Sequence, residues 1–270
     1  MKQGVQGFAG AGTPKCGTPN TARVPPQQRS ATPRDGVRER DTAVPGARGE
    51  HTHGERPVPG PQSAVQRPSV RGQVLDALRR ALVTGELKPG EVYSAPVLGE
   101  RFGVSATPVR EAMQQLALED AVEVVPNRGF RVVERGSQEI AELAEVRALI
   151  EVPVVLRLAR TLPAERWAHL RPLAEATVRA ASTGCPAAYA ESDRVFHGAV
   201  LSLSGNEQLV RVAEDLHRRS QWPPAGGPVR RGRTGLVADA AEHMALLEAL
   251  AARDLDGVRN VVREHFAGAR

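Results

Sequence analysis

Residues 103–120 read GVSATPVREAMQQLALED, and this stretch decides the fold of the first half of the chain. One apolar stripe recurs in it at helical spacing: Val109, Ala112, Met113 and Leu116. Thr107 is a candidate N-cap, and Pro108 suits the first helical position, where its missing N–H costs nothing. Gly103 supplies a turn before the helix. The stretch therefore predicts a helix that begins near Thr107, directly behind a tight turn.

The segments on either side complete a small domain. An upstream helix with a second apolar stripe should end at Gly85; the stripe comprises Val70, Val74, Leu78, Ala81 and Leu82. A short helix is expected over residues 95–102. Downstream, VEVVP and FRVVE flank Asn127–Gly129 as two β-branched strands around a turn. Three helices followed by a hairpin describe a winged helix-turn-helix, which we place at residues 69–135.

In a helix-turn-helix, the N-terminal end of the second motif helix enters the DNA major groove. Arg110 lies one turn into that helix, and an arginine there can bond guanine O6 and N7. Arg128, at the tip of the hairpin, could reach a phosphate or the minor groove. An ordinary amphipathic helix with surface arginines is the alternative, but the complete pattern favours DNA binding.

Composition separates the first 68 residues from the rest. They contain 10 Pro and 10 Gly and show no periodicity, which predicts a disordered tail. The whole chain has 36 Lys+Arg and 31 Asp+Glu. The tail holds 10 of these basic residues and 5 of the acidic ones, so it accounts for the whole net charge of +5. The tail could bind DNA non-specifically or reflect a misassigned start. DNA binding by the folded part must therefore rest on where arginines lie.

The chain has no apolar run long enough to span a membrane and no secretory signal at its N-terminus. Two cysteines are too few for a disulfide framework, which favours a reducing compartment. We therefore expect a cytoplasmic, nucleoid-associated protein without a membrane partner.

From residue 136 to 270 the chain reads as an all-helical domain, with expected helices at 137–161, 163–182, 186–204, 206–220, 236–252 and 254–268. Asp193 and His197 are four residues apart and so share an otherwise apolar helix face. They could form a buried hydrogen bond, half of an enzyme's metal site, or half of a sensing metal site.

Two later histidines also lie on apolar stripes. His243 and His265 belong to neighbouring helices of an antiparallel hairpin, so their side chains can approach each other. With Asp193 and His197 they form a plausible set of ligands for a divalent metal. His169 and His217 fit the inner stripes less well, and we expect them at the surface.

Arg147 is a further polar residue on an inward face. A guanidinium in a core needs an anion. Glu151, four residues along the same helix, could be that partner, or a ligand's carboxylate could bind Arg147 bidentately.

Residues 70–133 resemble the DNA-binding domain of GntR-family bacterial transcription regulators. The matching pieces are GELKPGEVY, LGERFGVSATPVREAMQQL and NRGFRV. The resemblance implies DNA contacts from five residues: Ser105, Thr107, Arg110, Arg128 and Gly129. The chain departs from the family at Ala106 and Pro96, where arginines are common, so the family's usual operator sequence does not carry over.

The second half resembles the all-helical effector domain, called FCD, of FadR-type GntR regulators. The matching pieces are EVRALIE, DRVFH, SGN and EHMALLEALAARD, together with His265. Metal-containing members bind the ion with an Asp and a His four apart and two later His about 22 apart. Carried over, the metal ligands are Asp193, His197, His243 and His265, and Arg147 faces the effector.

The sequence therefore predicts a mainly α protein in which a winged helix-turn-helix precedes an antiparallel helical bundle. The expected function is regulation of transcription by a homodimer on an inverted-repeat operator. A small organic acid bound near Zn, Ni or Mn would modulate the affinity for DNA. A purely structural metal, or no effector, is the alternative. A metal-dependent enzyme is a remote one, because HExxH, a Ser-His-Asp set and a phosphate loop are all missing.

Overall fold

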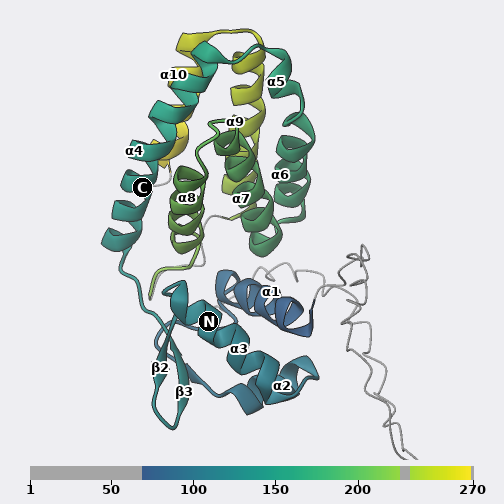
Figure 1. Ribbon diagram of the computed structural model, residues 1–270, viewed down its shortest axis with the longest axis vertical. Helices are drawn as coiled ribbons and strands as arrows, with labels where there is room; N and C mark the ends of the chain where they lie inside the picture. Colours follow the sequence, from purple (N-terminus) through teal and green to yellow (C-terminus); the bar gives the residue numbers. More distant parts are fainter. Residues whose placement is uncertain (1–68, 226–231, 269–270) are drawn as a thin grey trace, which may run out of the picture. The chain divides into compact units, whose positions relative to one another are not determined.

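The computed structural model describes residues 69–225 and 232–268, so the expected disordered tail at 1–68 lies outside the described residues. The first described domain contains three helices and a three-stranded antiparallel sheet (Figure 1). Its elements are α1 Val70–Val83, β1 Val92–Tyr93, α2 Ala95–Phe102, α3 Ala106–Leu118, β2 Val122–Val125 and β3 Gly129–Val132. β3 is the central strand and pairs Phe130 with both Tyr93 and Val124. The winged helix-turn-helix predicted from the sequence is confirmed.

The apolar stripe of α3 forms the centre of this domain. Its four residues Val109, Ala112, Met113 and Leu116 are completely buried. They pack against the stripe of α1, of which Val74, Leu78, Ala81 and Leu82 are buried. Val70 is exposed because it is the first residue of α1 and projects beyond the packed turn. Close packing of α1 on α3 holds the N-terminal end of α3 at the surface.

Two local details differ from the sequence prediction. Ser105, with extended backbone angles, is the N-cap of α3, so Thr107 lies inside the first turn. The reason is that Gly103 already ends α2 in the left-handed conformation, which completes the turn before Ser105. The sheet also has an unexpected third strand, because Val92 and Tyr93 pair with the free edge of the hairpin.

The second domain is a bundle of helices (Figure 1). Its elements are α4 Ser137–Thr161, α5 Glu165–Ala168, α6 Arg171–Thr183, α7 Pro186–Ser202, α8 Glu207–Ser220, α9 Arg233–Ala251 and α10 Leu255–Gly268. The expected helix at 163–182 is split, since Pro172 in the first turn of α6 favours a new helix start there. No helix among residues 69–225 and 232–268 has the length and apolarity that a membrane span requires.

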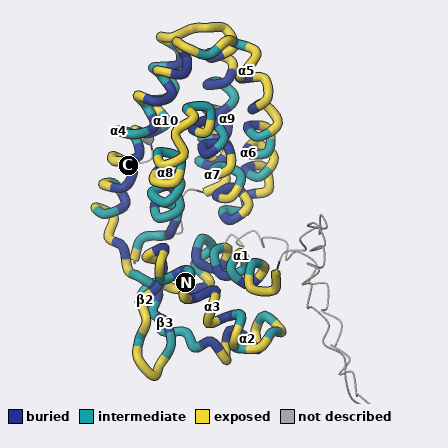
Figure 2. The backbone as a smooth tube through the Cα atoms, in the orientation of Figure 1, coloured by how far each residue is buried: buried dark blue, intermediate teal, exposed yellow. Residues whose placement is uncertain are grey.

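Leucine, valine and a few aromatic residues fill the bundle. The largest buried side chains in it are Trp167 and Phe196. Around them pack residues of α4, α7, α9 and α10, including Val154, Leu158, Val200, Leu247, Leu250, Val258 and Val262. Figure 2 shows this division between buried inner faces and exposed outer faces. Leu255, the first residue of α10, is 37% exposed.

A short segment after α8 packs into the winged domain. Trp222 is buried in the same apolar cluster as Leu82, Leu87 and Val132. The guanidinium of Arg135 lies over its ring, 4.8 Å from the centroid, which is a cation–π contact. The backbone N–H of Ala225 also donates to the carbonyl of Arg135. The sequence predicts only a loop at 221–235, of which residues 226–231 lie outside the described residues.

Gly129 allows a close approach of two strands that a side chain would prevent. Its φ is +132°, and a Cβ atom there would lie 2.3 Å from the carbonyl oxygen of Tyr93. We expect Gly129→Ala to lower the free energy of unfolding by at least about 2 kcal/mol, because it adds backbone strain and a backbone clash. Urea unfolding followed by circular dichroism measures this. Gly136→Ala is the matched control, since open space surrounds Gly136 and its φ is −73°. Equal effects of the two substitutions would contradict this account.

Candidate functional site

Asp193 and His197 lie on one face of α7, at the centre of the bundle. Asp193 Oδ1 is 3.6 Å from His197 Nε2 and 3.3 Å from His243 Nε2 of α9. The centroid of the His265 ring, on α10, lies 5.2 Å from the ring centroid of His197 and 5.1 Å from that of His243. The fold therefore brings together all four residues that the sequence proposes as metal ligands.

The protonation of His243 follows from its hydrogen bonds. The Thr177 hydroxyl donates to the carbonyl oxygen of Ala174 at 2.7 Å, so its oxygen accepts from His243 Nδ1 at 3.0 Å. Burial lowers the pKa of His243 well below its ordinary value, which keeps the ring neutral. With its proton on Nδ1, His243 presents a lone pair at Nε2. That lone pair faces a carboxylate oxygen of Asp193.

Carboxylates hold the other two rings in the same way. His197 Nδ1 donates to Glu151 Oε2 at 2.8 Å, and His265 Nδ1 donates to Glu242 Oε2 at 2.7 Å. Each histidine therefore uses Nδ1 for a fixed protein partner and leaves Nε2 available. A carboxylate or hydroxyl on the second nitrogen of a ring is the usual support of a metal-binding histidine.

Three buried atoms at the centre of the cluster make no hydrogen bond to a described residue: Asp193 Oδ1, His197 Nε2 and His243 Nε2. Buried polar atoms are rarely left unsatisfied, and acceptors that face each other repel. Ligands of one ion at about 2.1 Å lie about 3.0–3.4 Å apart, close to the distances from Asp193 Oδ1 to the two rings. Donor atoms of His197, His243 and His265 lie within 4.8 Å of one another. These residues fit a divalent cation.

Arg147 occupies the next layer of the network. Its Nε donates to Glu151 Oε1 at 2.8 Å, and its Nη2 lies 3.1 Å from His217 Nδ1. Burial alone would raise the pKa of Glu151, but Arg147 and His197 more than offset it and hold the pKa below its ordinary value. The internal partner considered for Arg147 is thus present. Three of its five N–H groups are engaged when the contact to Ser220 at 3.4 Å is included.

The expectation that His217 lies at the surface is wrong. Its side chain is buried, and Nε2 donates to Asp193 Oδ2 at 2.8 Å while Nδ1 accepts from Arg147. Burial and the Arg147 charge lower the pKa of His217 to about 4, so the ring is neutral. The signal for its position was the buried stripe Ala213, His217 and Ser220 of α8, at spacings of four and three. His169 is exposed, as expected.

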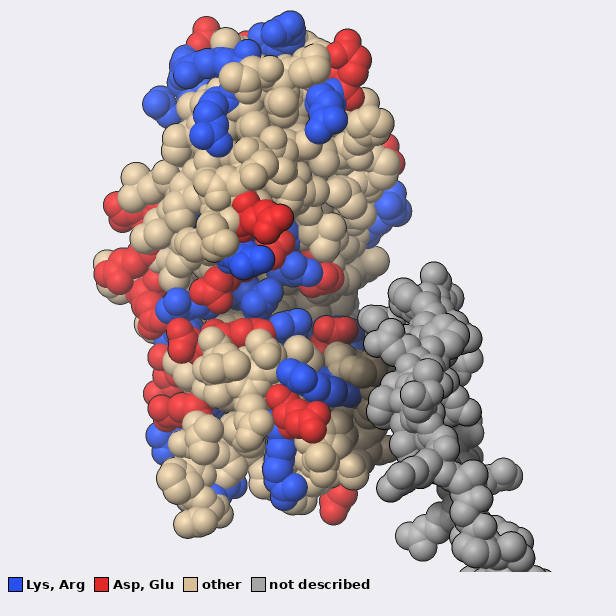
Figure 3. Space-filling view, in the orientation of Figure 1, with Lys and Arg blue, Asp and Glu red and all other residues tan. Residues whose placement is uncertain are grey.

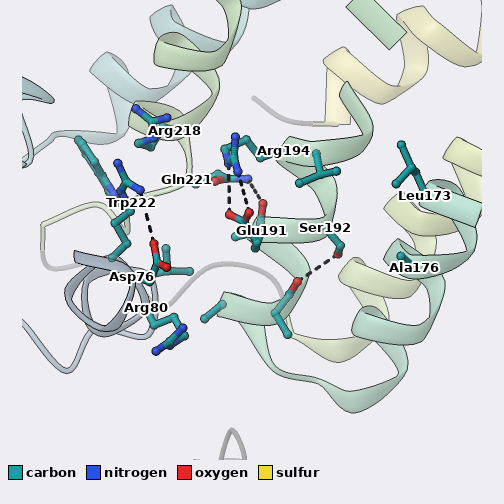
Figure 4. A pocket seen from close by; sticks show the side chains of 16 residues that line it. Asp76, Arg80, Leu173, Ala176, Glu191, Ser192, Arg194, Arg218, Gln221 and Trp222 are labelled. Carbon is teal, nitrogen blue, oxygen red and sulfur yellow. Dashed lines mark hydrogen bonds and ion pairs between the residues drawn. The ribbon is translucent and has the colours of Figure 1, made fainter. Parts of the chain in front are cut away.

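A small cavity of about 90 Å³ opens beside these groups. Polar residues from five helices line it, among them Arg147, Asp193, His217, Ser220, Asp239 and His265, with Tyr189 and Leu236 on the apolar side. A second hollow, of about 580 Å³, is lined by α1, α6, α7 and α8 (Figure 4). Arg79, Arg194 and Arg218 of that hollow are paired with Asp76, Glu191 and Glu119, whereas exposed Arg80 has no ion pair among the described residues. The smaller cavity is the one that adjoins Asp193 and His265 of the histidine cluster, so we take it as the candidate site for a ligand of a bound metal.

The proposed DNA-contacting residues lie on exposed parts of the winged domain. Ser105, Thr107 and Arg110 are exposed at the N-terminal end of α3, and Arg128 is exposed at the hairpin tip. Within the described part of the chain, their side chains have no hydrogen bond or ion pair. Gly129, half-buried in β3, is needed for the strand contact with Tyr93. On the face drawn in Figure 3, side chains of both signs of charge are interspersed.

Comparison with known families matches both domains. Residues 70–132 match the bacterial regulatory proteins of the gntR family, and residues 142–268 match the FCD domain. The HTH-type transcriptional regulator McbR of Escherichia coli is 30% identical over 197 residues, which cover 71% of this chain and 87% of McbR.

The chain belongs to the GntR family.

As a GntR-family protein with an FCD domain, it is a DNA-binding transcriptional regulator and not an enzyme. The transcriptional repressor GlaR of E. coli is also similar, at 27% identity over 70% of this chain and 89% of GlaR. The solved structure of E. coli McbR aligns with a TM-score of 0.58 at 29% identity, covering 74% of this chain and 94% of McbR. A Rhodococcus GntR structure, at 21% identity and a TM-score of 0.54, shares the fold.

Glu151 is the buried counter-charge of Arg147, and we expect Glu151→Gln to lower the free energy of unfolding by about 3–5 kcal/mol. The neutral amide would leave the buried guanidinium of Arg147 without its counter-charge, and the amide NH₂ would replace an oxygen that accepts from either Arg147 Nε or His197 Nδ1. Denaturant unfolding at neutral pH measures the change. The control is Glu175→Gln, which removes the exposed pair with Arg179 at 3.9 Å and should cost under about 0.5 kcal/mol. If Glu151→Gln leaves the free energy of unfolding unchanged, the Arg147–Glu151 pair is not required for stability.

Proposed function

We propose that this GntR-family regulator binds an inverted-repeat DNA operator as a homodimer, and that a small organic acid held beside a divalent metal changes its affinity for that operator. The observation that carries the proposal is the pair of buried acceptors, Asp193 Oδ1 and His243 Nε2, that face each other at 3.3 Å. A cation between them removes their repulsion and satisfies both.

The metal would be held by Asp193, His197, His243 and His265. Four protein ligands leave open positions on a five- or six-coordinate ion, so Ni²⁺, Mn²⁺ or Zn²⁺ with an expanded shell suits a sensor. When bound, the ion supplies positive charge and an open coordination position for a ligand's carboxylate. Thr177, Glu151 and Glu242 orient the three rings by accepting from their Nδ1 atoms.

The effector would occupy the cavity lined by Arg147, Asp193 and His217. A volume of about 90 Å³ suits an acid of only a few carbon atoms. Arg147 keeps one further N–H on each terminal nitrogen, since one contact from each is already used. A small carboxylate between the ion and Arg147 would have positive charge on both sides.

The C-terminal end of α8 offers a route from this cavity to the DNA-binding domain. His217 and Gln221 contact Asp193, and the next residue, Trp222, packs in the winged core. Arg218 and Arg219 also pair with Glu119 and Asp120, directly after α3, at 3.8 Å and 3.7 Å. A ligand that binds more tightly when α8 is in one of two positions would favour that position. Through these contacts it would also favour one arrangement of the winged domains, which is linkage between two sites.

We assign residues 69–135 to DNA binding and 136–270 to metal binding, effector binding and dimerisation, in the cytoplasm on the nucleoid. A structural metal without an effector is the second candidate. The existing bonds of Arg147 to Glu151, His217 and Ser220 favour it, because they already satisfy much of the guanidinium. A screen of small organic acids against the metal-loaded protein, read by release or tightening of DNA, decides between the two.

Arg110 should read a base in each half-site. We expect Arg110→Ala to weaken operator binding by about 1–3 kcal/mol and to relax specificity at one position per half-site. Binding to operator variants measured by fluorescence anisotropy at fixed salt tests this. Arg166→Ala, an exposed arginine in the helical domain, is the control and should change nothing. Unchanged binding by Arg110→Ala would mean that α3 does not dock as proposed.

His265→Ala should reduce the bound metal, because one ligand is lost, whereas Arg147→Lys should leave the metal in place. Arg147→Lys keeps a positive charge beside Glu151 but loses the forked N–H groups, so the effector response should weaken by about 1.5–3 kcal/mol. Elemental analysis and operator titration report the two effects separately.

His169→Ala is the matched control for loss of a histidine, because His169 is exposed. If the wild-type protein remains metal-free after incubation with Zn²⁺, Ni²⁺ and Mn²⁺, the metal proposal is wrong and the cluster is a buried hydrogen-bond network. If the metal binds but no acid changes DNA binding, the structural candidate stands.

A further inference from the structure

The outer face of α4 carries a large exposed apolar surface. Leu149 is 70% exposed and Val146 is 42% exposed, on the side of α4 opposite its buried residues Arg147, Glu151 and Val154. Pro153 is also exposed there, and Leu156 is partly exposed. Figure 2 shows exposed positions along this edge of the bundle. Scattered exposed apolar residues need no explanation, but a contiguous row along one helix indicates a contact surface.

Charged residues flank this row at both ends. Eight residues share an arc of about 120° around the helix axis, at 100° per residue: Glu142, Glu145, Val146, Leu149, Pro153, Leu156, Arg157 and Arg160. The acidic pair lies toward the N-terminal end and the basic pair toward the C-terminal end.

The order of these residues is symmetric about position 151. If a second α4 runs antiparallel to the first, Glu142 lies opposite Arg160 and Glu145 lies opposite Arg157 of the other copy. The apolar pairs then become Val146 with Leu156 and Leu149 with Pro153. A two-fold interface requires this kind of self-complementarity, because the same patch must meet itself.

Among the described residues, the charged side chains on this face form no ion pairs. Across the described residues, the side chains of Glu145, Arg157 and Arg160 form no ion pair. Glu142 only accepts a hydrogen bond from Gln138 at 3.0 Å. The remaining acidic residue near the start of α4, Glu139, pairs with Arg135 instead and lies outside the row. Both the acidic and the basic pair therefore remain available for another molecule.

We propose that the outer face of α4 is the dimer interface, and that its occupant is α4 of a second copy of this chain in antiparallel orientation. The apolar centre from Val146 to Leu156 is buried by association, and the two Glu–Arg ends fix the register and direction. The inference deepens the proposed function, since it rests on the homodimer proposed there and names the surface that forms it.

The test exchanges the charges of the full-length chain. Variant A carries Arg157→Glu and Arg160→Glu, and variant B carries Glu142→Arg and Glu145→Arg. In A with A or B with B, like charges meet at both ends of the interface, whereas A with B restores opposite charges at both ends. We expect each variant alone to dimerise at least tenfold more weakly than wild type, and an equimolar mixture to recover dimers that contain one copy of each.

Analytical ultracentrifugation measures the dimer dissociation constants, and native mass spectrometry identifies the mixed dimer. The matched control, Arg166→Glu with Arg171→Glu, changes two exposed arginines off α4 and should dimerise like wild type. Circular dichroism melting confirms that A and B are folded, and recovery in the mixture excludes misfolding as the cause of weak association. If A alone stays fully dimeric, or if A and B do not recover together, the interface assignment is wrong.

The outcomes also separate this inference from the proposed function. A monomeric wild-type chain would overturn the homodimer itself. A dimeric wild type with unaffected charge variants would overturn only the assignment of the α4 face and leave metal and effector binding to be judged on their own measurements.

Discussion

The helical domain must compensate the negative charge of two buried carboxylates, Glu151 and Asp193. A buried negative charge is costly unless cations or donors surround it. Arg147 and His197 satisfy Glu151, and His217 satisfies one oxygen of Asp193. The other oxygen of Asp193 faces histidine nitrogens that have no hydrogen bond among the described residues, so the packing of α4, α7, α8, α9 and α10 around it forms the candidate cation site.

The same network connects two kinds of chemistry. Asp193 belongs to the candidate metal cluster, Arg147 lines the candidate effector cavity, and His217 bonds to both. Because neutral His217 donates to one and accepts from the other, a change at either group alters the other's hydrogen bonding. The C-terminal end of α8 carries His217 and leads directly to Trp222 in the winged core. Regulation of DNA binding by the proposed effector would require such a physical connection between the two sites.

The two opposite faces of α4 contribute to different surfaces of the helical domain. Its inner face contributes Arg147 and Glu151 to the buried network, and its outer face carries the self-complementary row centred on position 151. A dimer formed through that row would place the two effector cavities one helix away from the interface. Rearrangement at Arg147 would then act on a helix shared with the second copy, which gives the proposed linkage a second route.

Periodicity and turn residues were enough to predict the winged helix-turn-helix and the helical bundle, because stripes such as Val109–Leu116 and caps such as Gly103 are local signals. Helical spacing also placed Asp193, His197, His243 and His265 on inward faces. The sequence could not assign His217, Thr177 or Trp222, since their partners lie on other elements: Arg147 is 70 residues from His217, and Leu82 is 140 residues from Trp222. Which nitrogen of each histidine is free, and which atoms face each other unsatisfied, was decided only by tertiary packing, because a hydrogen bond between helices depends on how they meet in space.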